Sequence, residues 1–498
     1  MKKISLIALL LISLVVLSAK SSVAQDSTFK LSDYKNPNYF YQTLDLNFRL
    51  NSRSAGSKSD NTSHFHDGNR YDFSLNARAA YSLYSNSLKS QSQLDVWLPI
   101  FISKGGLHNI YELQNKEDKQ NSFSHNEAFQ IYGLKRFYNT QQNYFEVNGS
   151  ISTGYSGNSG TSKNYDSDTI FNSISANHKG ANYSMNGSFL IGNGRIEQVQ
   201  DAQLALYLLE DMQRLNLDKR SVSNKEVLEL ARLITSLKYK RFFDDRLKKI
   251  AEITAIDSFM QKTGLVSISD AAYFTSLNDN WDYANNPARE SGYRLFTGIQ
   301  GSFASSSNRN HEETFVPVVT TTDRKSSRHE SYLYLVAGLT HEKPINLKWQ
   351  QSASVKASAG FKSMFTSYGG TNVSDIKEYT SAIPALRINA DYGYGFYPNS
   401  RTWLNANIYI AAIYEEQYAG TSKEDKELWQ NSFSANTGLN VHAYYYLSEK
   451  LRLSVSFSGY YDIYHDKFFN DLHNGTNDEE TRSDWNHQMQ ATLTYSLF

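Results

Sequence analysis

The sequence of 498 residues contains no cysteine, only seven prolines and no long apolar run after its first 24 residues. The absence of cysteine excludes a disulfide framework, a thiolate metal site and a lipid-modified N-terminal cysteine. The absence of long apolar runs excludes a polytopic helical membrane protein, because a helix needs roughly 20 apolar residues to cross a bilayer. The 50 basic and 50 acidic residues balance, so the electrostatics do not indicate a nucleic-acid partner.

Aromatic residues are abundant, at 14% of the chain, with 35 tyrosines and 27 phenylalanines. This content excludes a disordered chain. Residues 1–24 begin with the basic pair Lys2-Lys3, continue with an apolar stretch too short to span a membrane, and end in Ser-Val-Ala. We therefore expect a secretory signal peptide over residues 1–24 and a mature chain that is exported across the inner membrane.

Most of the remaining chain alternates between apolar and polar residues with a period of two. In residues 451–463, for example, leucine, valine, phenylalanine, tyrosine and isoleucine side chains fall on one face, and mostly serine on the other. Residues 71–83, 347–361 and 433–447 repeat this pattern, which is typical of β-strands with one apolar face. A soluble β-sandwich could show the same alternation, but these segments exceed the five or six residues that are usual for soluble strands.

The segments between the expected strands alternate in length along the chain. We expect tight turns near residues 87–90, 139–142, 344–346, 398–400 and 447–450. We expect long polar loops at residues 51–70, 104–121, 157–167, 306–328, 367–376, 416–429 and 467–482. Short turns at one end of the strands and long loops at the other are the pattern of outer-membrane barrels.

With these features the chain resembles bacterial outer-membrane β-barrel proteins of the porin-like kind, and its aromatic-rich, cysteine-free style is most similar to barrels of Bacteroidota. The resemblance implies an antiparallel, all-β transmembrane barrel in the cell outer membrane, in contact with outer-membrane lipid and with both termini toward the periplasm. The chain also ends in the aromatic Phe498. In such barrels that residue helps the barrel-assembly machinery recognise the last strand, although here it is out of phase with the apolar face of residues 487–497.

A helical insertion interrupts the strand pattern. Across residues 196–262 apolar residues recur at spacings of three and four, the period of an amphipathic helix. Ser223 and Glu226 have the spacing of a capping box at a helix start. Irregular polar sequence is then expected up to about residue 291. The expected organisation is a signal peptide (1–24), an N-terminal barrel part (25–195), the helical insertion (196–290) and a C-terminal barrel part (291–498).

The expected strand count predicts on which side of the membrane the insertion lies. Six strands before it and eight after it give about 14, with 16 as the alternative, because residues 168–179 could form a strand of their own. Counting back from a periplasmic C-terminus puts the insertion in the periplasm. There it would either plug the lumen or dock a periplasmic partner.

Ten charged side chains are expected to face the lumen, among positions rich in serine, asparagine, glycine and glutamine. These candidates are Asp45, Arg49, Arg78, Arg294, Lys348, Lys356, Arg387, Asp391, Arg452 and Asp462. As pore lining they would bias ion passage; alternatively, they pair across the lumen and fill it. Fourteen strands fall between barrels of eight strands, which are filled by side chains, and those of 16–18 strands, which hold a water channel.

We therefore expect a porin-like channel for the diffusion of small solutes, with a structural or partner-binding outer-membrane protein as the alternative. We do not expect an enzyme, because no serine lies in a recognisable nucleophile context and no G-x-S-x-G is present. The sequence assigns no catalytic, cofactor-binding or metal-binding residue, and no cofactor is expected.

Overall fold

The computed structural model describes residues 29–35, 38–61, 64–111, 116–166, 169–217, 220–238, 245–266, 270–282, 289–316, 318–371, 373–418, 428–447, 451–470 and 476–495. The expected signal peptide and the terminal Phe498 lie outside these residues.

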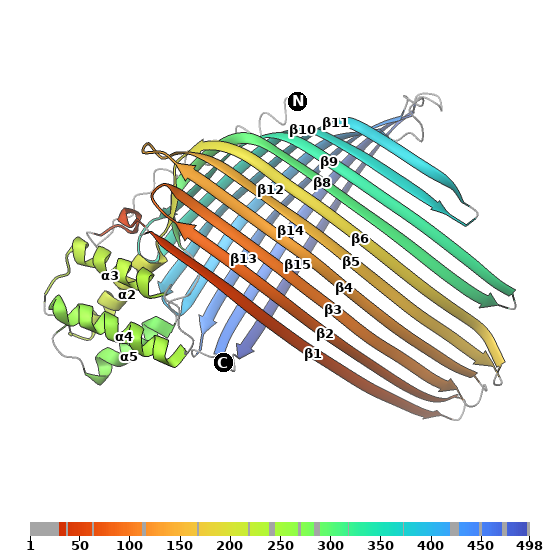
Figure 1. The fold of residues 1–498 in the computed structure, drawn as a ribbon, viewed down its shortest axis with the longest axis horizontal. Helices are drawn as coiled ribbons and strands as arrows, with labels where there is room; N and C mark the ends of the chain where they lie inside the picture. Colours follow the sequence, from red (N-terminus) through yellow and green to blue (C-terminus); the bar gives the residue numbers. More distant parts are fainter. Residues whose placement is uncertain are drawn as a thin grey trace.

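Long antiparallel strands, each paired with the next long strand in the chain, build one continuous sheet (Figure 1). The strands are β1 (Tyr39–Asn61), β2 (His64–Asn86), β3 (Ser90–Tyr111), β4 (Lys116–Tyr138), β5 (Asn143–Asp166), β6 (Thr169–Asn193), β8 (Glu290–Val316), β9 (Val318–Pro344), β10 (Trp349–Gly370), β11 (Val373–Asn399), β12 (Thr402–Tyr418), β13 (Leu428–Tyr446), β14 (Leu451–Asn470) and β15 (Thr476–Tyr495). Residues 169–179 belong to β6 and do not form a strand of their own.

The polar segments that we expected to be long loops are largely strand. β1 and β2, for example, stay paired from Tyr39 opposite Asn86 to Asn61 opposite His64. The strands have 17 to 27 residues, about twice the 9–11 residues that a strand needs to cross a bilayer. Pairing satisfies the backbone groups of a polar segment as well as those of an apolar one, so the hairpins continue past the end of the alternating apolar pattern.

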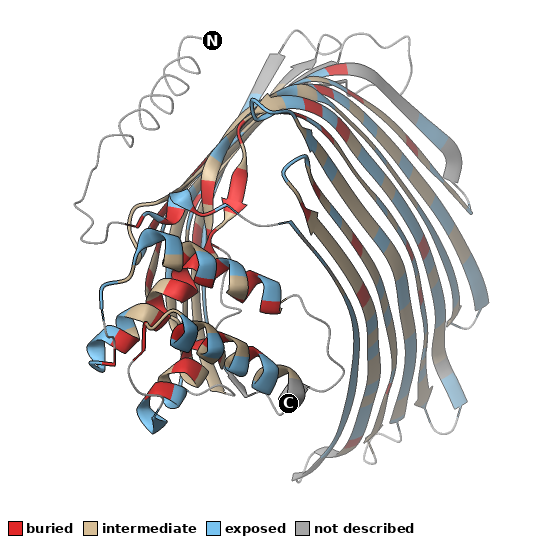
Figure 2. Ribbon diagram, turned by 60° about the vertical axis from the view of Figure 1, so that its left-hand side comes forward, coloured by how far each residue is buried: buried red, intermediate tan, exposed pale blue. Residues whose placement is uncertain are grey.

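The expected strand count of 14 or 16 is wrong for the described residues, and their sheet does not close into a barrel. These residues form fifteen strands, fourteen of them on the continuous path, while the short β7 (Ile196–Gln198) pairs with β8 beside it. Three residues are too few for the sequence pattern to reveal β7. The sheet is curved but open (Figure 2), and the described parts of β1 and β15 each pair with a single neighbour. Local alternation specifies faces, and it contains no information on whether the two edges meet.

The insertion between β7 and β8 contains the helices α2 (Gln200–Arg214), α3 (Asn224–Lys238), α4 (Asp245–Lys262) and α5 (Ala271–Asp282). α5 occupies a segment that we expected to be irregular. No helix in the described ranges is both long enough and apolar enough to cross a membrane.

The helices and the N-terminal segment share a hydrophobic core. Val199, Leu208 and Ile234 are completely buried there, together with Tyr34 from the segment that includes the 3-10 helix η2 (Leu31–Asp33). The Tyr34 hydroxyl lies 2.6 Å from the Thr235 hydroxyl of α3. We call residues 29–35 and α2–α5 the helical unit; Figure 2 shows how strongly buried residues concentrate in its helices.

The helical unit lies at the end of the sheet that carries the short turns (Figure 1). The Tyr207 hydroxyl of α2 donates to the carbonyl of Tyr397 at 2.6 Å, close to the turn between β11 and β12. Arg401, in that turn, forms an ion pair with Asp279 of α5. Both β1 and β15 also have their terminal residues, Tyr39 and Tyr495, at this end, which we call the turn end.

Candidate functional site

The strand register places the expected lumen charges on one face of the sheet. Directly opposed residues of paired strands share a face; Arg387, for example, lies opposite Ser358. Following the register from strand to strand puts every candidate that lies within a strand on the same face, which we call the polar face: Asp45, Arg49, Arg78, Arg294, Lys356, Arg387, Asp391, Arg452 and Asp462. Lys348 lies outside the strands, in the turn just before β10.

The opposite face is apolar and exposed. Leu46, Leu335 and Met489 have 62%, 68% and 71% of their surface accessible. Side chains of this kind occupy stretches next to the turn end, such as residues 40–50 on β1 and 183–191 on β6. We call these stretches the apolar belt. Their length matches the roughly 9–11 residues with which a tilted strand crosses a bilayer.

Four neighbouring strands bring a basic and aromatic cluster together on the polar face. The Lys362 amine of β10 and the Arg387 guanidinium of β11 donate to the two carboxylate oxygens of Glu415 on β12, at 3.1 and 2.9 Å. The Arg387 guanidinium carbon lies 4.8 Å from the ring centre of Tyr332 and 5.2 Å from that of Tyr334, both on β9. We call these five residues the central cluster.

The central cluster carries more positive than negative charge. Glu415 neutralises one of its two cations, and the Lys362 and Glu415 side chains are only 7% and 10% exposed. The Arg387 side chain is 32% exposed. A guanidinium that stacks on tyrosine rings and remains partly exposed can bind an anionic or strongly polar solute.

A second group of charges lies on the polar face closer to the turn end. Arg136 of β4 and Glu146 of β5 form an ion pair whose side chains are 15% and 6% exposed. The Asp95 carboxylate of β3 accepts hydrogen bonds from the Ser82 hydroxyl at 2.7 Å and from the Gln93 amide at 2.6 Å. Charges of both signs are therefore held in fixed positions at this level.

The other candidates interact mainly with neutral partners. The Lys356 amine donates to Gln300 at 2.8 Å, and Ser354 donates to Asp391 at 3.2 Å. Asp462 accepts a hydrogen bond from Asn436, and Arg452 lies over the ring of Tyr444 at 5.0 Å. Asp45, Arg49 and Arg78 are exposed on β1 and β2. Arg387 is thus the candidate that the structure brings into the central cluster.

The sequence pattern did not indicate Lys362, Glu415, Arg136, Glu146 or Asp95 as site residues. Lys362 could have been found, because it is in phase with the candidates Lys348 and Lys356. Glu415 directly precedes the loop expected at residues 416–429, so an error of one residue in this boundary places it in the loop.

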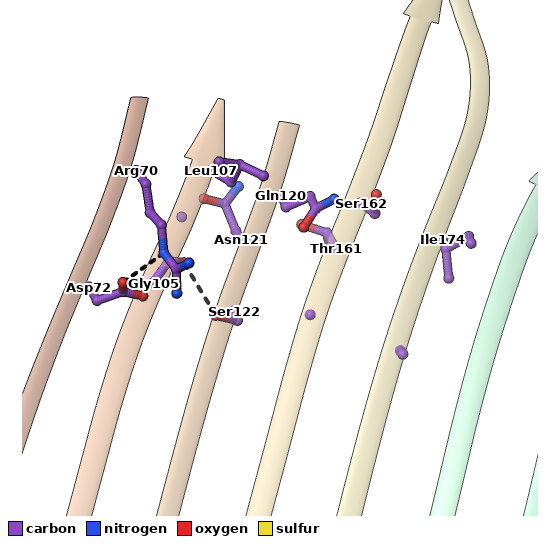
Figure 3. A pocket seen from close by; sticks show the side chains of 13 residues that line it. Arg70, Asp72, Gly105, Leu107, Gln120, Asn121, Ser122, Thr161, Ser162 and Ile174 are labelled. Atoms are coloured by element: carbon purple, nitrogen blue, oxygen red, sulfur yellow. Dashed lines mark hydrogen bonds and ion pairs between the residues drawn. The ribbon is translucent and has the colours of Figure 1, made fainter. Parts of the chain in front are cut away.

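The polar face also forms a shallow hollow across β2 to β6, near the end of these strands that lies opposite the turn end (Figure 3). It has a volume of about 440 Å³, and its lining includes the Arg70–Asp72 ion pair, at 2.9 Å, and the glycines Gly105 and Gly160. Such a surface offers polar groups to small solutes. Across the described ranges, no group of three or more His, Asp or Glu residues could hold a metal ion.

Comparison with known proteins gives only distant structural similarities. No family model matches the chain, and no curated protein matches it. The translocator domain of the autotransporter NalP from Neisseria meningitidis is 11% identical, with a TM-score of 0.26 over 81% of this chain and 88% of that one. The Pseudomonas putida toluene transporter TodX is 9% identical, with a TM-score of 0.24 over 94% and 91%. The alcaligin outer-membrane receptor FauA from Bordetella pertussis is 8% identical, with a TM-score of 0.22 over 92% and 76%.

Similarities at this level carry no argument about function. The features of the molecule that bear on its function are the two faces of the sheet and the contacts of the charged residues.

Proposed function

We propose that the protein is an outer-membrane β-barrel that acts as a porin-like channel for small polar solutes. The observation that carries the proposal is the separation of the two faces. One face exposes large apolar side chains over a belt of membrane height, and the other carries the expected lumen charges, with serines and asparagines. Exposed apolar surface of this extent is costly in water and favourable against lipid. The polar face then lines the lumen.

The proposal requires that the sheet closes in the membrane. An open edge in lipid would leave backbone N–H and C=O groups without partners, each at a cost of several kcal/mol. The path of fourteen long strands leaves β1 and β15 antiparallel to each other, so the two edges have the relative direction that pairing requires.

In such a barrel the central cluster would act on the solutes that pass. Its excess positive charge favours anions, and its tyrosine rings offer flat surfaces on which polar solutes can stack. The closely held charges nearer the turn end form a second level of fixed charge along the same path.

The end of the sheet that carries the helical unit is proposed to face the periplasm. The short turns and the described ends of β1 and β15 lie at this end, which is the periplasmic side in outer-membrane barrels. Outer-membrane lipid around the apolar belt and the barrel-assembly machinery during biogenesis are then the expected partners.

The test is the conductance of the purified full chain in a planar lipid bilayer. We expect discrete channels with a preference for anions. A comparison chain, in which a short Gly/Ser linker replaces residues 200–282, shows whether the helical unit obstructs the lumen, in which case its channels conduct more. Both chains should migrate differently on a gel before and after boiling, as closed barrels do. Folded chains that never conduct would contradict the channel.

The second candidate function is partner binding through the helical unit. It is favoured by the unit's own hydrophobic core and by its position beside the turns, where the outward helix surfaces are free of the sheet. A barrel that folds but conducts neither with nor without the helices would favour this function.

A further inference from the structure

The apolar face carries a row of three basic side chains beyond the apolar belt. Lys179 of β6 lies directly opposite Arg309 of β8, and Arg309 lies directly opposite Lys325 of β9. All three are exposed. Directly opposed residues on one face have Cβ atoms about 5 Å apart, where like charges destabilise a sheet. We call these residues the basic row.

The charge of the basic row is only partly compensated. The Asp323 carboxylate lies 4.0 Å from the Arg309 guanidinium and 3.0 Å from the ring of His311. Glu313, on the same face, is four residues from Arg309, or about 13 Å at 3.3 Å per residue. That exceeds the Debye length of about 8 Å at physiological ionic strength. A net positive charge therefore remains on this outward surface.

An aromatic row on the same strands marks the edge of the apolar belt that lies away from the turn end. The rings of Tyr183 and Phe303 have centroids 6.2 Å apart, those of Phe303 and His329 are 6.4 Å apart, and those of His329 and Phe365 are 5.5 Å apart. They come from β6, β8, β9 and β10. Aromatic side chains at this level are typical of the boundary between hydrocarbon and headgroups.

The basic row lies at the height of the lipid headgroups above this boundary. Lys179 and Lys325 are each four residues beyond Tyr183 and His329, which is about 13 Å along the strand. With a strand tilt of about 40°, this is about 10 Å along the membrane normal. The headgroup layer extends roughly 5–8 Å beyond the hydrocarbon on each side, within reach of long lysine and arginine side chains.

We propose that Lys179, Arg309 and Lys325 bind the phosphate groups of a phosphorylated lipid in the outer leaflet. The inference rests on the proposed function, because it needs the apolar face to be embedded in lipid. A phosphate between these side chains relieves the repulsion of the row. The arginine supplies a fork of donors for phosphate oxygens, while the lysines act as point charges.

The experiment is native mass spectrometry of the full chain in a nonionic detergent, titrated with dioleoyl phosphatidic acid, dioleoyl phosphatidylcholine or inorganic phosphate. We expect the wild type to retain phosphatidic acid in preference to phosphatidylcholine. In the variant Lys179→Gln/Arg309→Gln/Lys325→Gln, the apparent affinity for phosphatidic acid should fall by about tenfold or more, since each basic side chain near an anionic lipid surface contributes about fivefold.

The matched control is the variant Arg53→Gln/Lys116→Gln/Arg324→Gln. It removes the same charge from exposed positions beyond the belt on the polar face, and its lipid binding should not change. Equal losses in both variants, or no loss in the first, would overturn the proposal. Displacement of the lipid by equimolar inorganic phosphate would overturn the lipid assignment and leave a free-phosphate site.

Two further measurements distinguish a failure of the barrel to fold from a failure of the basic row to bind lipid. Gel migration before and after boiling reports folding, and a chain without a heat-dependent shift would refute the barrel itself, independently of the lipid site. If the triple variant does not fold, Lys325→Gln alone should still lower the affinity in the same direction by about fivefold, and no change in that variant would overturn the proposal.

Discussion

At the scale of single residues, the cations on the polar face differ in whether they share a carboxylate or have one of their own. Glu415 accepts hydrogen bonds from both Lys362 and Arg387, so one carboxylate holds two cations. Arg136 instead has Glu146 as its own partner. Substitutions within the central cluster therefore change the local net charge in a predictable direction. The cluster lines the path that we propose for ions through the lumen.

Substitutions of Glu415 and Lys362 should change ion selectivity in opposite directions. Glu415→Gln leaves two cations without a counter-charge and should increase the preference for anions. Lys362→Met leaves one cation and one carboxylate and should decrease it. The measurement is the reversal potential of single channels in a KCl gradient. Because the group is largely buried, removing Glu415 should also cost about 3 kcal/mol of stability.

The control is Lys135→Met, which removes one positive charge from the apolar face of β4. Its reversal potential should equal that of the wild type. If Lys135→Met shifts selectivity as much as Lys362→Met does, the polar face does not line the conducting path.

At the scale of single elements, the start of α3 depends on a capping box, which the structure confirms. The backbone N–H of Ser223 donates to the Glu226 carboxylate at 3.0 Å, and the N–H of Glu226 donates to the Ser223 hydroxyl at 3.4 Å. The Arg220 guanidinium also binds this carboxylate and donates to the carbonyl of Thr263, just after α4, at 2.9 Å. Hydrogen bonds from Arg220 and then Ser223 lower the pKa of Glu226 to about 2.

The contribution of Glu226 to stability should depend on pH. Because its pKa is lower in the folded protein than its ordinary value of 4.5, the stabilisation is complete above about pH 4.5 and is lost as the pH falls toward 2. Glu226→Gln should lower the free energy of unfolding of the helical unit by about 1 kcal/mol at pH 6. The measurement is the thermal transition, followed by circular dichroism at 222 nm. The difference from the wild type should shrink between pH 4.5 and 2.

Glu229→Gln is the matched control on the same helix, since Glu229 is 44% exposed and only 3.8 Å from Lys225 in a surface pair. This substitution should change the free energy of unfolding by less than about 0.5 kcal/mol. A difference between Glu226→Gln and the wild type that stays constant from pH 6 to 2 would contradict the assigned role of the carboxylate.

At the scale of the whole molecule, the short turns and the helical unit share one end of the sheet. Hairpins such as the one between β8 and β9 lie at the other end. If the sheet spans the outer membrane, these two ends face different compartments. The chain has no cysteine, so an introduced thiol reports on a single site.

Thr321→Cys, near the β8–β9 hairpin, should react with a membrane-impermeant thiol reagent in intact cells. Ser236→Cys, on the exposed surface of α3, should react only after the outer membrane is opened. Both positions are exposed, and such substitutions usually change stability by less than about 0.5 kcal/mol. Equal labelling of both positions in intact cells would place the helical unit outside the cell.

The sequence by itself determined the two faces of the strands and the place of the helices. The alternation over residues 71–83 and 451–463 identifies the apolar face because successive side chains of a strand point to opposite sides. The spacing of Ser223 and Glu226 determined the start of α3 for a similar reason, since the capping contact is made within one turn of the helix.

Only the tertiary structure decided which residues meet and how far the sheet extends. The central cluster needs the mutual register of four strands, and Tyr34 reaches Thr235 of α3 across most of the first half of the chain. The expected loops became strands, α5 and β7 appeared, and the sheet stayed open at β1 and β15. Each of these features depends on pairing or packing between distant segments, whereas the alternation of neighbouring residues determines only which way each side chain points.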